Sequence, residues 1–419
     1  MKLDIASILS RPHADPVVER LVRYASIGTT SDRHATEIPS TPQQWELARL
    51  LVDELQALGL ADVELDGHCY LIARLPASPG FEGKPSIGLM AHIDTASDAP
   101  GSDVKPQIHK AWNGSPIALA DGLAIDPVLD TELAEHVGDT LVCTDGRSLL
   151  GADDKAGVAE IMTAVAWLLA HPEIKHGPLE IIFTPDEETG NGMNLFPVKN
   201  LKSVACYTVD GSSAGEVEAE CFSAWEAKID ITGKSIHPGY ARGKLANATA
   251  MAAAYVALLP RSESPEATDG WYGYYNPHEI SGGVEKARVE ILVRDFEDEG
   301  ISRRLATLET LARAVEAQFP GGKVEVTTRK QYLNMKRKLD ENPKVLERAF
   351  EAARRAGVEP YSKPIRGGTD GSRLTEMGIP TPNIFTGGHA YHSRLEWASA
   401  AEMVLAVDTL LELVRLWSE

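Results

Sequence analysis

Apolar residues along the chain alternate between short continuous runs and longer stretches with helical spacing, a pattern typical of α/β folds. The short runs predict buried strands over residues 70–75, 87–91, 179–184 and 204–209. The helical spacing predicts helices over residues 41–58 and 156–169 and a final helix up to about residue 416. Gly59 ends the first of these helices, and Ser399 and Glu402 form the capping box of the last.

The pattern changes character between residues 218 and 336. Alternating apolar positions predict strands over residues 225–231, 287–293 and 323–328, and helical spacing predicts helices over residues 246–259 and 301–319. This strand–helix–strand–helix–strand order predicts a small sheet covered by two helices, which we interpret as an inserted α+β lid domain. The predicted catalytic domain is therefore discontinuous and comprises residues 1–217 and 337–419, with the lid at 218–336.

Composition supports two domains and narrows the possible partners. A chain of 419 residues that is 43% hydrophobic is too long for one ordinary core. Its formal net charge of −20 disfavours nucleic acid and anionic membranes as partners. The N-terminal sequence is not that of a signal peptide, and no apolar run reaches the ~18 residues of a membrane span. Four cysteines without a CxxC pair predict free, buried thiols and a cytoplasmic location.

Acidic residues and histidines, which are common metal ligands, come directly after the predicted strands. A strand fixes the position of such a residue, and the loop that follows exposes its side chain. His92 follows the strand over residues 87–91, and Asp94 lies two residues on. Residues two apart in extended backbone share a side, so Asp94 can accept the second ring N–H of His92 and orient it toward a metal. An ordinary polar strand end is the alternative interpretation.

Three further acidic segments have similar positions. Asp153 and Asp154 come after a glycine turn at the start of a predicted helix, where they could cap the helix or bridge two cations. Glu187 and Glu188 end the strand over 179–184, in an acidic run that is costly without a nearby cation but is also common on surfaces. Asp210 follows the strand over 204–209, where a turn residue is the simpler interpretation.

The last candidate metal ligand is a histidine near the C-terminus, and on spacing alone it could be either His389 or His392. A set of histidines and carboxylates without thiolates suits a catalytic zinc site, with cobalt or manganese as substitutes. Two metals about 3.5–4 Å apart can activate a shared water and polarise a carbonyl, which is the chemistry of amide hydrolysis. A dinucleotide-binding fold is poorly supported, because the glycine turn before Asp153 lacks the GxGxxG spacing.

Eight segments together resemble the two-zinc exopeptidases of the M20 type, and in particular the peptidase T family of aminotripeptidases, over nearly the whole chain. They are AHIDTASDAPG (91–101), TDGRSLLGADDKAGVAEIMTA (144–164), FTPDEETG (183–190), YTVDG (207–211), IHPGYARGKLANA (236–248), RDFE (294–297), IRGGTDGSRL (365–374) and NIFTGGHAYH (383–392). The resemblance implies a zinc-exopeptidase-type catalytic domain, with a central mixed sheet flanked by helices, and the inserted lid.

The resemblance also implies a role for each candidate residue. His92 and Asp210 would hold one zinc ion, Glu188 and His392 a second, and Asp153 would bridge both, across a peptide bond to Asp154 that is often cis in this class. Asp94 would orient His92, and Glu187 would be the general base. His237 in the lid would donate a hydrogen bond to the oxyanion. Arg294 or Arg366 would anchor the C-terminal carboxylate of a short peptide, with Asn247 assisting, and this anchor matches a preference for tripeptides. The resemblance leaves open which of the two arginines does so.

Some features remain open at this point. Thr189 stands where the family often has valine, and Arg394-Leu395-Glu396 stands where a Lys-His-Glu run is expected, although every ligand position is intact. The alternatives to an aminotripeptidase are another two-zinc amide hydrolase (a dipeptidase, a carboxypeptidase or an N-acyl amino acid deacylase) and an inactive binding protein. The sequence leaves monomer and homodimer equally open.

Overall fold

The computed structural model describes residues 3–419, which divide into two compact units. The first unit comprises residues up to Ala219 together with Arg337–Lys363 and Thr369–Glu419, and the second comprises Glu220–Lys336 and Pro364–Gly368. No helix among the described residues is long and apolar enough to cross a membrane.

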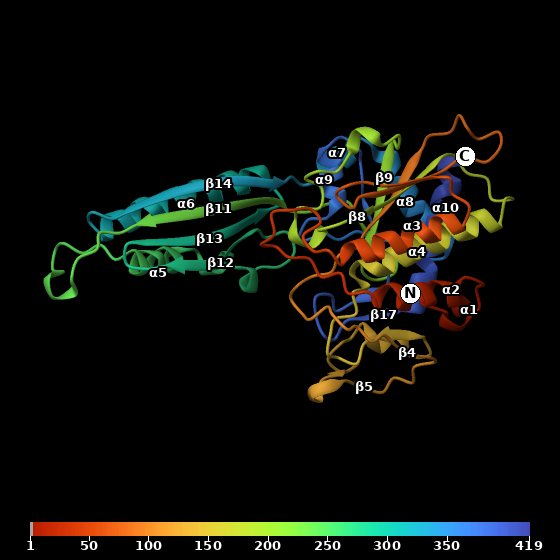
Figure 1. Ribbon diagram of the computed structural model, residues 1–419, viewed down its shortest axis with the longest axis horizontal. Helices are drawn as coiled ribbons and strands as arrows, with labels where there is room; N and C mark the ends of the chain where they lie inside the picture. Colours follow the sequence, from red (N-terminus) through yellow and green to blue (C-terminus); the bar gives the residue numbers. More distant parts are fainter. Residues whose placement is uncertain (1–2) are drawn as a thin grey trace. The chain divides into compact units, whose positions relative to one another are not determined.

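A seven-stranded mixed sheet forms the centre of the first unit (Figure 1). Its strands, in spatial order, are β1 (Asp62–Leu65), β2 (Leu71–Leu75), β8 (Leu179–Thr184), β3 (Ile87–His92), β9 (Ala205–Gly211), β15 (Asn383–Phe385) and β10 (Val217–Glu218). Strands β8, β3, β9 and β15 run parallel to one another, whereas the outer pairings are antiparallel. This sheet and its helices confirm the predicted fold class. Because β8, β3 and β9 are adjacent and parallel, their carboxyl ends lie along one edge, where a site can form.

Among the described residues, eight α-helices belong wholly or mainly to this unit. They are α1 (Ile5–Leu9), α2 (Ala14–Ala25), α3 (Gln44–Ala57), α4 (Ala152–Ala170), α7 (Lys336–Asp340), α8 (Pro343–Ala356), α9 (Asp370–Glu376) and α10 (Ala400–Ser418). Helix α4 is buried on nearly all sides, because it packs against β3 and β9 and also against α2 and α10. Gly157 allows this close approach: a Cβ atom there would lie 1.8 Å from the carbonyl oxygen of Val209.

A second, smaller sheet in the same unit was not predicted from the sequence. It consists of β16 (Gly388–His389), β17 (Trp397–Ser399), β7 (Leu141–Cys143) and β4 (Gln107–His109), beside the two-stranded pair β5 (Ile117–Ala118) and β6 (Ala124–Ile125). These strands have two or three residues each, too few for an apolar period to be visible. Trp397 and Trp112 lie in the apolar cluster that this sheet covers.

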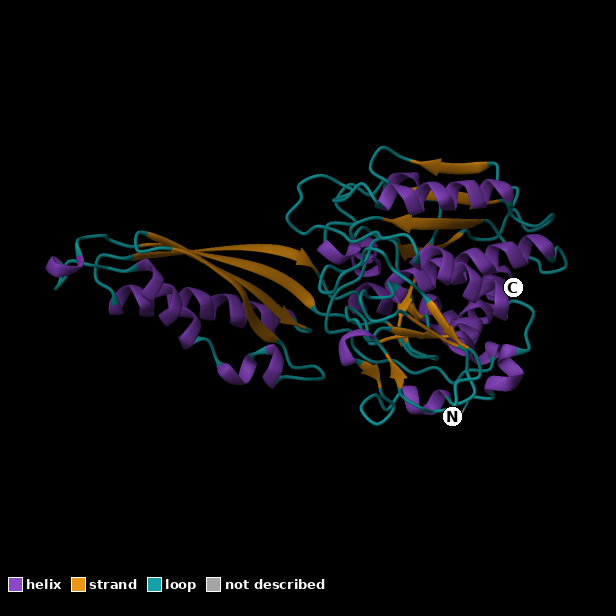
Figure 2. Ribbon diagram, turned by 60° about the horizontal axis from the view of Figure 1, so that its bottom comes forward, coloured by secondary structure: helices purple, strands orange, loops and turns teal. Residues whose placement is uncertain are grey.

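The second unit is a four-stranded antiparallel sheet with helices α5 (Ala248–Leu258) and α6 (Asp298–Gln318) on one face (Figure 2). The strand order is β12 (Tyr274–Gly282), β13 (Lys286–Asp295), β11 (Ser223–Thr232) and β14 (Lys323–Tyr332). The prediction of three strands was incomplete, because β12 was missed. This strand lies at the sheet edge, is mostly exposed, and has an irregular register next to Pro277, so it lacks the alternation by which strands are recognised.

The bounds of one strand and one helix that carry candidate metal ligands also differ from the prediction. Strand β9 extends through Gly211, so Asp210 lies within the strand and not after it. Helix α4 begins at Ala152, but Asp153 and Asp154 have non-helical backbone angles, and the peptide bond between them is cis, as the resemblance implied.

Candidate metal centre

His92, the last residue of β3, lies with its ring against Asp94. Its Nδ1 atom lies 3.1 Å from the carbonyl oxygen of Asp94 and 3.3 Å from the Oδ1 atom of the same residue. With Nδ1–H donating to Asp94, the lone pair of Nε2 remains free to bind a cation. The side chain of Asp94 is fully buried and also accepts the backbone N–H groups of Glu187, at 3.0 Å, and Glu188, at 3.2 Å. One carboxylate thus orients both the imidazole and the acidic loop after β8.

Asp153 places one carboxylate oxygen against each of two histidines. Its Oδ1 atom lies 2.9 Å from Nε2 of His92, and its Oδ2 atom lies 3.2 Å from Nε2 of His392. Asp210 completes the first group, with Oδ1 3.7 Å from Nε2 of His92. Glu188 completes the second, with Oε2 3.1 Å from Nε2 of His392. These are two groups of three side chains that could each hold a metal ion, and Asp153 belongs to both.

The side chains of the first group shift one another's pKa. Burial would lower the pKa of His92, but its hydrogen bonds with Asp153, Asp210 and Asp94 raise it well above the usual value. Burial raises the pKa of Asp210 to about 6. Burial also opposes ionisation of Asp153, yet its hydrogen bonds with the two histidines lower the pKa of this carboxyl.

In the second group, too, the pKa of the histidine and that of the carboxyl are raised. Hydrogen bonds with Asp153 and Glu188 raise the pKa of His392 to about 11. Burial raises the pKa of Glu188 to about 7, and the Oε1 atom of this residue is buried without a hydrogen-bond partner among the described residues. Burial likewise raises the pKa of Glu187 well above the usual range. An unpaired carboxylate oxygen beside imidazoles that face other carboxylates fits a site built for divalent cations. The donor set, nitrogen and oxygen without sulfur, suits zinc.

The four cysteines take no part in these groups. All are free and buried, as predicted.

Asp186, the acid that precedes Glu187 and Glu188, has a local structural role, because its carboxylate accepts hydrogen bonds from Ser40 and Gln44.

Two buried acids next to the site were missed from the sequence. Glu396 accepts the backbone N–H groups of Leu150 and Gly151, both at 2.8 Å, and that of Asp153, at 3.1 Å. Asp370 accepts the hydroxyl of Thr184 at 2.6 Å. Asp370 lies within the segment 365–374 and Glu396 ends the segment 394–396, but their partners are distant in sequence, so no local signal assigns them.

The four predicted substrate-binding residues lie in the second unit. His237 is exposed, and its Nδ1 atom accepts the backbone N–H of Gly239 at 3.1 Å. The side-chain oxygen of Asn247 caps helix α5 by accepting the N–H of Thr249 at 3.0 Å. The first of the two arginines, Arg294, donates from Nη1 to the carbonyl oxygens of the sheet at positions 225 and 293.

Arg366 is the more heavily engaged of the two arginines. Its Nη1 atom donates to the carbonyl oxygens of Gly270 and Tyr272, and its Nη2 atom donates to both the carbonyl and the hydroxyl of Thr268. The guanidinium also lies over the rings of Phe222 and Tyr274. These contacts hold the loop over residues 268–272.

Comparisons with known proteins agree with this fold. Residues 148–416 match the model of peptidase family M20/M25/M40. Peptidase T of Geobacillus kaustophilus (strain HTA426) is 44% identical over 405 residues, which cover 96% of this chain and 98% of that protein. The crystal structure of aminopeptidase PepT from Bacillus cereus ATCC 10987 has a TM-score of 0.75 at 22% identity, over 97% of this chain and 99% of that one. A tripeptidase from Staphylococcus aureus subsp. aureus Mu50 gives the same TM-score and identity, over 97% and 98%.

The chain belongs to peptidase family M20/M25/M40. Within that family it groups with the peptidase T proteins, because the identity to them extends over nearly the full length of both chains.

Proposed function

We propose that this protein is a two-zinc aminopeptidase that removes the N-terminal residue from tripeptides. Family membership and the peptidase T relatives support the reaction class. The observation that carries the proposal is the position of Asp153, with one oxygen toward His92 and the other toward His392. A carboxylate in this position can bridge two cations. The similar Staphylococcus aureus protein is described as a tripeptidase, which supports the choice of substrate.

The metal-binding roles follow from the two groups of side chains. His92 and Asp210 are proposed to hold one zinc ion and Glu188 and His392 the other, with Asp153 shared. When bound, the zinc ions supply the Lewis acidity that polarises the peptide carbonyl and lowers the pKa of a water molecule.

Glu187 is proposed as the general base. It accepts a proton from the attacking water as the new carbon–oxygen bond forms, and it returns that proton to the amine nitrogen as the carbon–nitrogen bond breaks. Its backbone N–H is held by Asp94, which also holds His92, so the base and the first group of ligands share one support. Burial keeps the carboxylate of Glu187 more basic than one in water.

Binding of the peptide is assigned to the second unit, which we propose to be a lid. Because Nδ1 of His237 accepts the Gly239 N–H, a neutral ring carries its proton on Nε2, and that N–H can donate to a tetrahedral oxyanion. Nearly all the N–H groups of Arg366 are used by the loop over residues 268–272. In contrast, Nε and Nη2 of Arg294 have no hydrogen-bond acceptor among the described residues. Arg294 is therefore the better candidate for the peptide carboxylate, and Asn247 would assist it.

Hydrolysis of a free tripeptide by the purified protein tests the proposal. We expect release of the N-terminal residue, its loss after treatment with a chelator, and its recovery when zinc is restored. A matched panel of a dipeptide, an acylated amino acid and an N-acetylated tripeptide defines the class, because only the free tripeptide should be a good substrate. Release of a C-terminal residue, or activity that survives complete metal removal, would contradict the proposal.

The proposed place of action is the cytoplasm, where reducing conditions keep buried thiols such as Cys143 and Cys206 free.

A further inference from the structure

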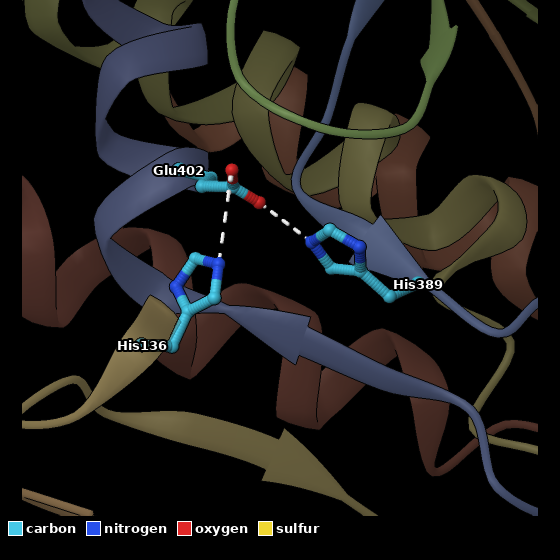
Figure 3. A group of neighbouring side chains, drawn as sticks. All are labelled: His136, His389 and Glu402. Carbon is cyan, nitrogen blue, oxygen red and sulfur yellow. Dashed lines mark hydrogen bonds and ion pairs between the residues drawn. The ribbon is translucent and has the colours of Figure 1, made fainter. Parts of the chain in front are cut away.

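A second cluster of histidine and carboxylate side chains lies in the first unit, apart from the candidate metal centre. It consists of His136, in a 3₁₀ turn (Leu133–His136), His389 on β16, and Glu402 in the first turn of α10. All three are buried, with exposed fractions of 5%, 2% and 4%. Figure 3 shows both imidazole rings directed toward the carboxylate of Glu402.

The three side chains converge at one point. Nε2 of His389 lies 2.6 Å from Oε2 of Glu402, and Nε2 of His136 lies 3.9 Å from Oε1 of the same carboxylate. One donor atom from each residue lies within 4.8 Å of the others, so a single cation could reach all three. The corresponding distances in the candidate metal centre, between 2.9 and 3.7 Å from His92, are similar.

Each histidine of the cluster is also oriented by a second carboxylate. Nδ1 of His136 lies 3.1 Å from Oδ2 of Asp139, and Nδ1 of His389 lies 3.0 Å from Oε2 of Glu132. Histidines that bind metals usually donate their other ring N–H to a carboxylate or a carbonyl, which fixes the tautomer and directs the free lone pair at the ion. Here that arrangement occurs twice, and both lone pairs point at Glu402.

Glu402 departs from the role that its sequence position predicts. In a capping box its side chain would return to the backbone N–H of Ser399, but that N–H donates to the carbonyl of Gly387 instead. Only half of the box forms, in which Ser399 accepts the N–H of Glu402 at 3.1 Å. The carboxylate turns to His389 and to the N–H of Ala214. Departures from local rules of this kind concentrate at functional sites.

We propose that His136, His389 and Glu402 form a third metal site, which binds one divalent cation of the zinc class. Two neutral imidazoles and one carboxylate are a common set of three protein ligands for zinc. The ring of Trp397 stacks on His389 with centroids 4.0 Å apart and covers one side of the site. A buried, enclosed ion in this place is structural: it joins β16 to the start of α10, and β16 leads directly into the loop that carries His392.

A metal-free ion network is the alternative. In that case His389 is protonated, because the carboxylates of Glu402 and Glu132 outweigh its burial and raise its pKa to about 9. The two interpretations differ in a quantity that can be measured, which is the number of zinc ions per chain.

The experiment compares zinc content, by elemental analysis after saturation and gel filtration, in the whole protein and three variants. His136→Gln removes one ligand of the cluster. His176→Gln is the matched control, because His176 is also buried in the first unit but its Nδ1 atom lies 2.9 Å from a backbone carbonyl, that of Gly177, and not beside a carboxylate. Asp153→Asn disturbs the candidate metal centre alone.

We expect three zinc ions in the unmodified protein and in His176→Gln, and two in His136→Gln. Adding His136→Gln to Asp153→Asn should remove one further ion, so the result does not depend on the catalytic centre holding metal. The proposal of a third site is overturned if His136→Gln leaves the zinc content unchanged both in the otherwise unmodified protein and in Asp153→Asn. If His136→Gln does not fold, His389→Gln takes its place in both comparisons: the loss of one zinc ion is expected, and an equal zinc content overturns the proposal.

Discussion

Glu396 holds the backbone of Asp153, with its Oε1 atom accepting the Asp153 N–H at 3.1 Å. Its other oxygen accepts the N–H groups of Leu150 and Gly151. The loop that carries Asp153, the proposed bridging carboxylate, is therefore fixed by three hydrogen bonds to one buried acid that is outside both groups of candidate ligands. Three donors facing one carboxylate also explain why an acid is needed there, since an amide would turn its own N–H₂ group toward one of them.

Replacement of Glu396 tests this support. In Glu396→Gln the amide leaves at least one backbone N–H group without an acceptor, so the position of Asp153 becomes less well defined. We expect zinc affinity to fall about 10–100-fold, as for other residues that orient metal ligands. Competitive zinc titration measures this, and Glu173→Gln, at an exposed acid, should leave affinity unchanged. Unchanged affinity in Glu396→Gln would show that the loop does not need this acid.

Replacement of Glu187 separates proton transfer from metal binding. Glu187→Gln keeps the size of the side chain and lies outside both groups of ligands, but it cannot accept a proton. We expect normal zinc content, an unchanged melting temperature and a kcat lower by about 10²–10⁴-fold. Steady-state kinetics with elemental analysis on the same sample measures both quantities. A kcat close to that of the unmodified enzyme would remove Glu187 as the base.

Gly157→Ala tests the approach of α4 to β9. Alanine in a helix interior normally stabilises by about 0.5–1 kcal/mol relative to glycine. At this position the added methyl group would meet the carbonyl of Val209, so we expect a loss of stability of about 1–3 kcal/mol instead. Gly83→Ala, where a Cβ atom meets nothing within 4 Å, is the control for denaturant unfolding. A stabilised Gly157→Ala protein would mean that α4 can move away without cost.

The two arginines of the second unit should respond differently to lysine. Arg294→Lys is expected to raise KM for a tripeptide about tenfold or more, because lysine lacks the pair of N–H groups that binds both oxygens of a carboxylate. The same variant should have little effect on KM for the peptide with a C-terminal amide, which has no carboxylate to bind. Arg366→Lys is expected to lower the melting temperature, because the loop over 268–272 loses its donors. Equal effects of Arg294→Lys on the acid and the amide would exclude it as the carboxylate anchor.

Much of the candidate site could be predicted because its residues stand next to apolar strands. His92, Glu188 and Asp210 follow or end runs that only buried strands would have, and parallel strands bring their ends together. The strand β12 could not be predicted, because an exposed edge strand with a proline lacks an apolar period. The small sheet that carries His389 was missed for a similar reason, since strands of two or three residues are too short to show one.

The sequence by itself determined the α/β class, the family resemblance and the candidate ligands, because apolar period and motif spacing are properties of neighbouring residues. Spacing alone leaves His389 and His392 equivalent, and only the resemblance favours His392. The tertiary structure shows what each one faces: His392 faces Asp153, whereas His389 faces Glu402. It alone also revealed the contact of Glu396 with Asp153 and that of His136 with Glu402, pairs that are each more than 240 residues apart in sequence. Such contacts depend on how the chain folds back on itself, which no local pattern specifies.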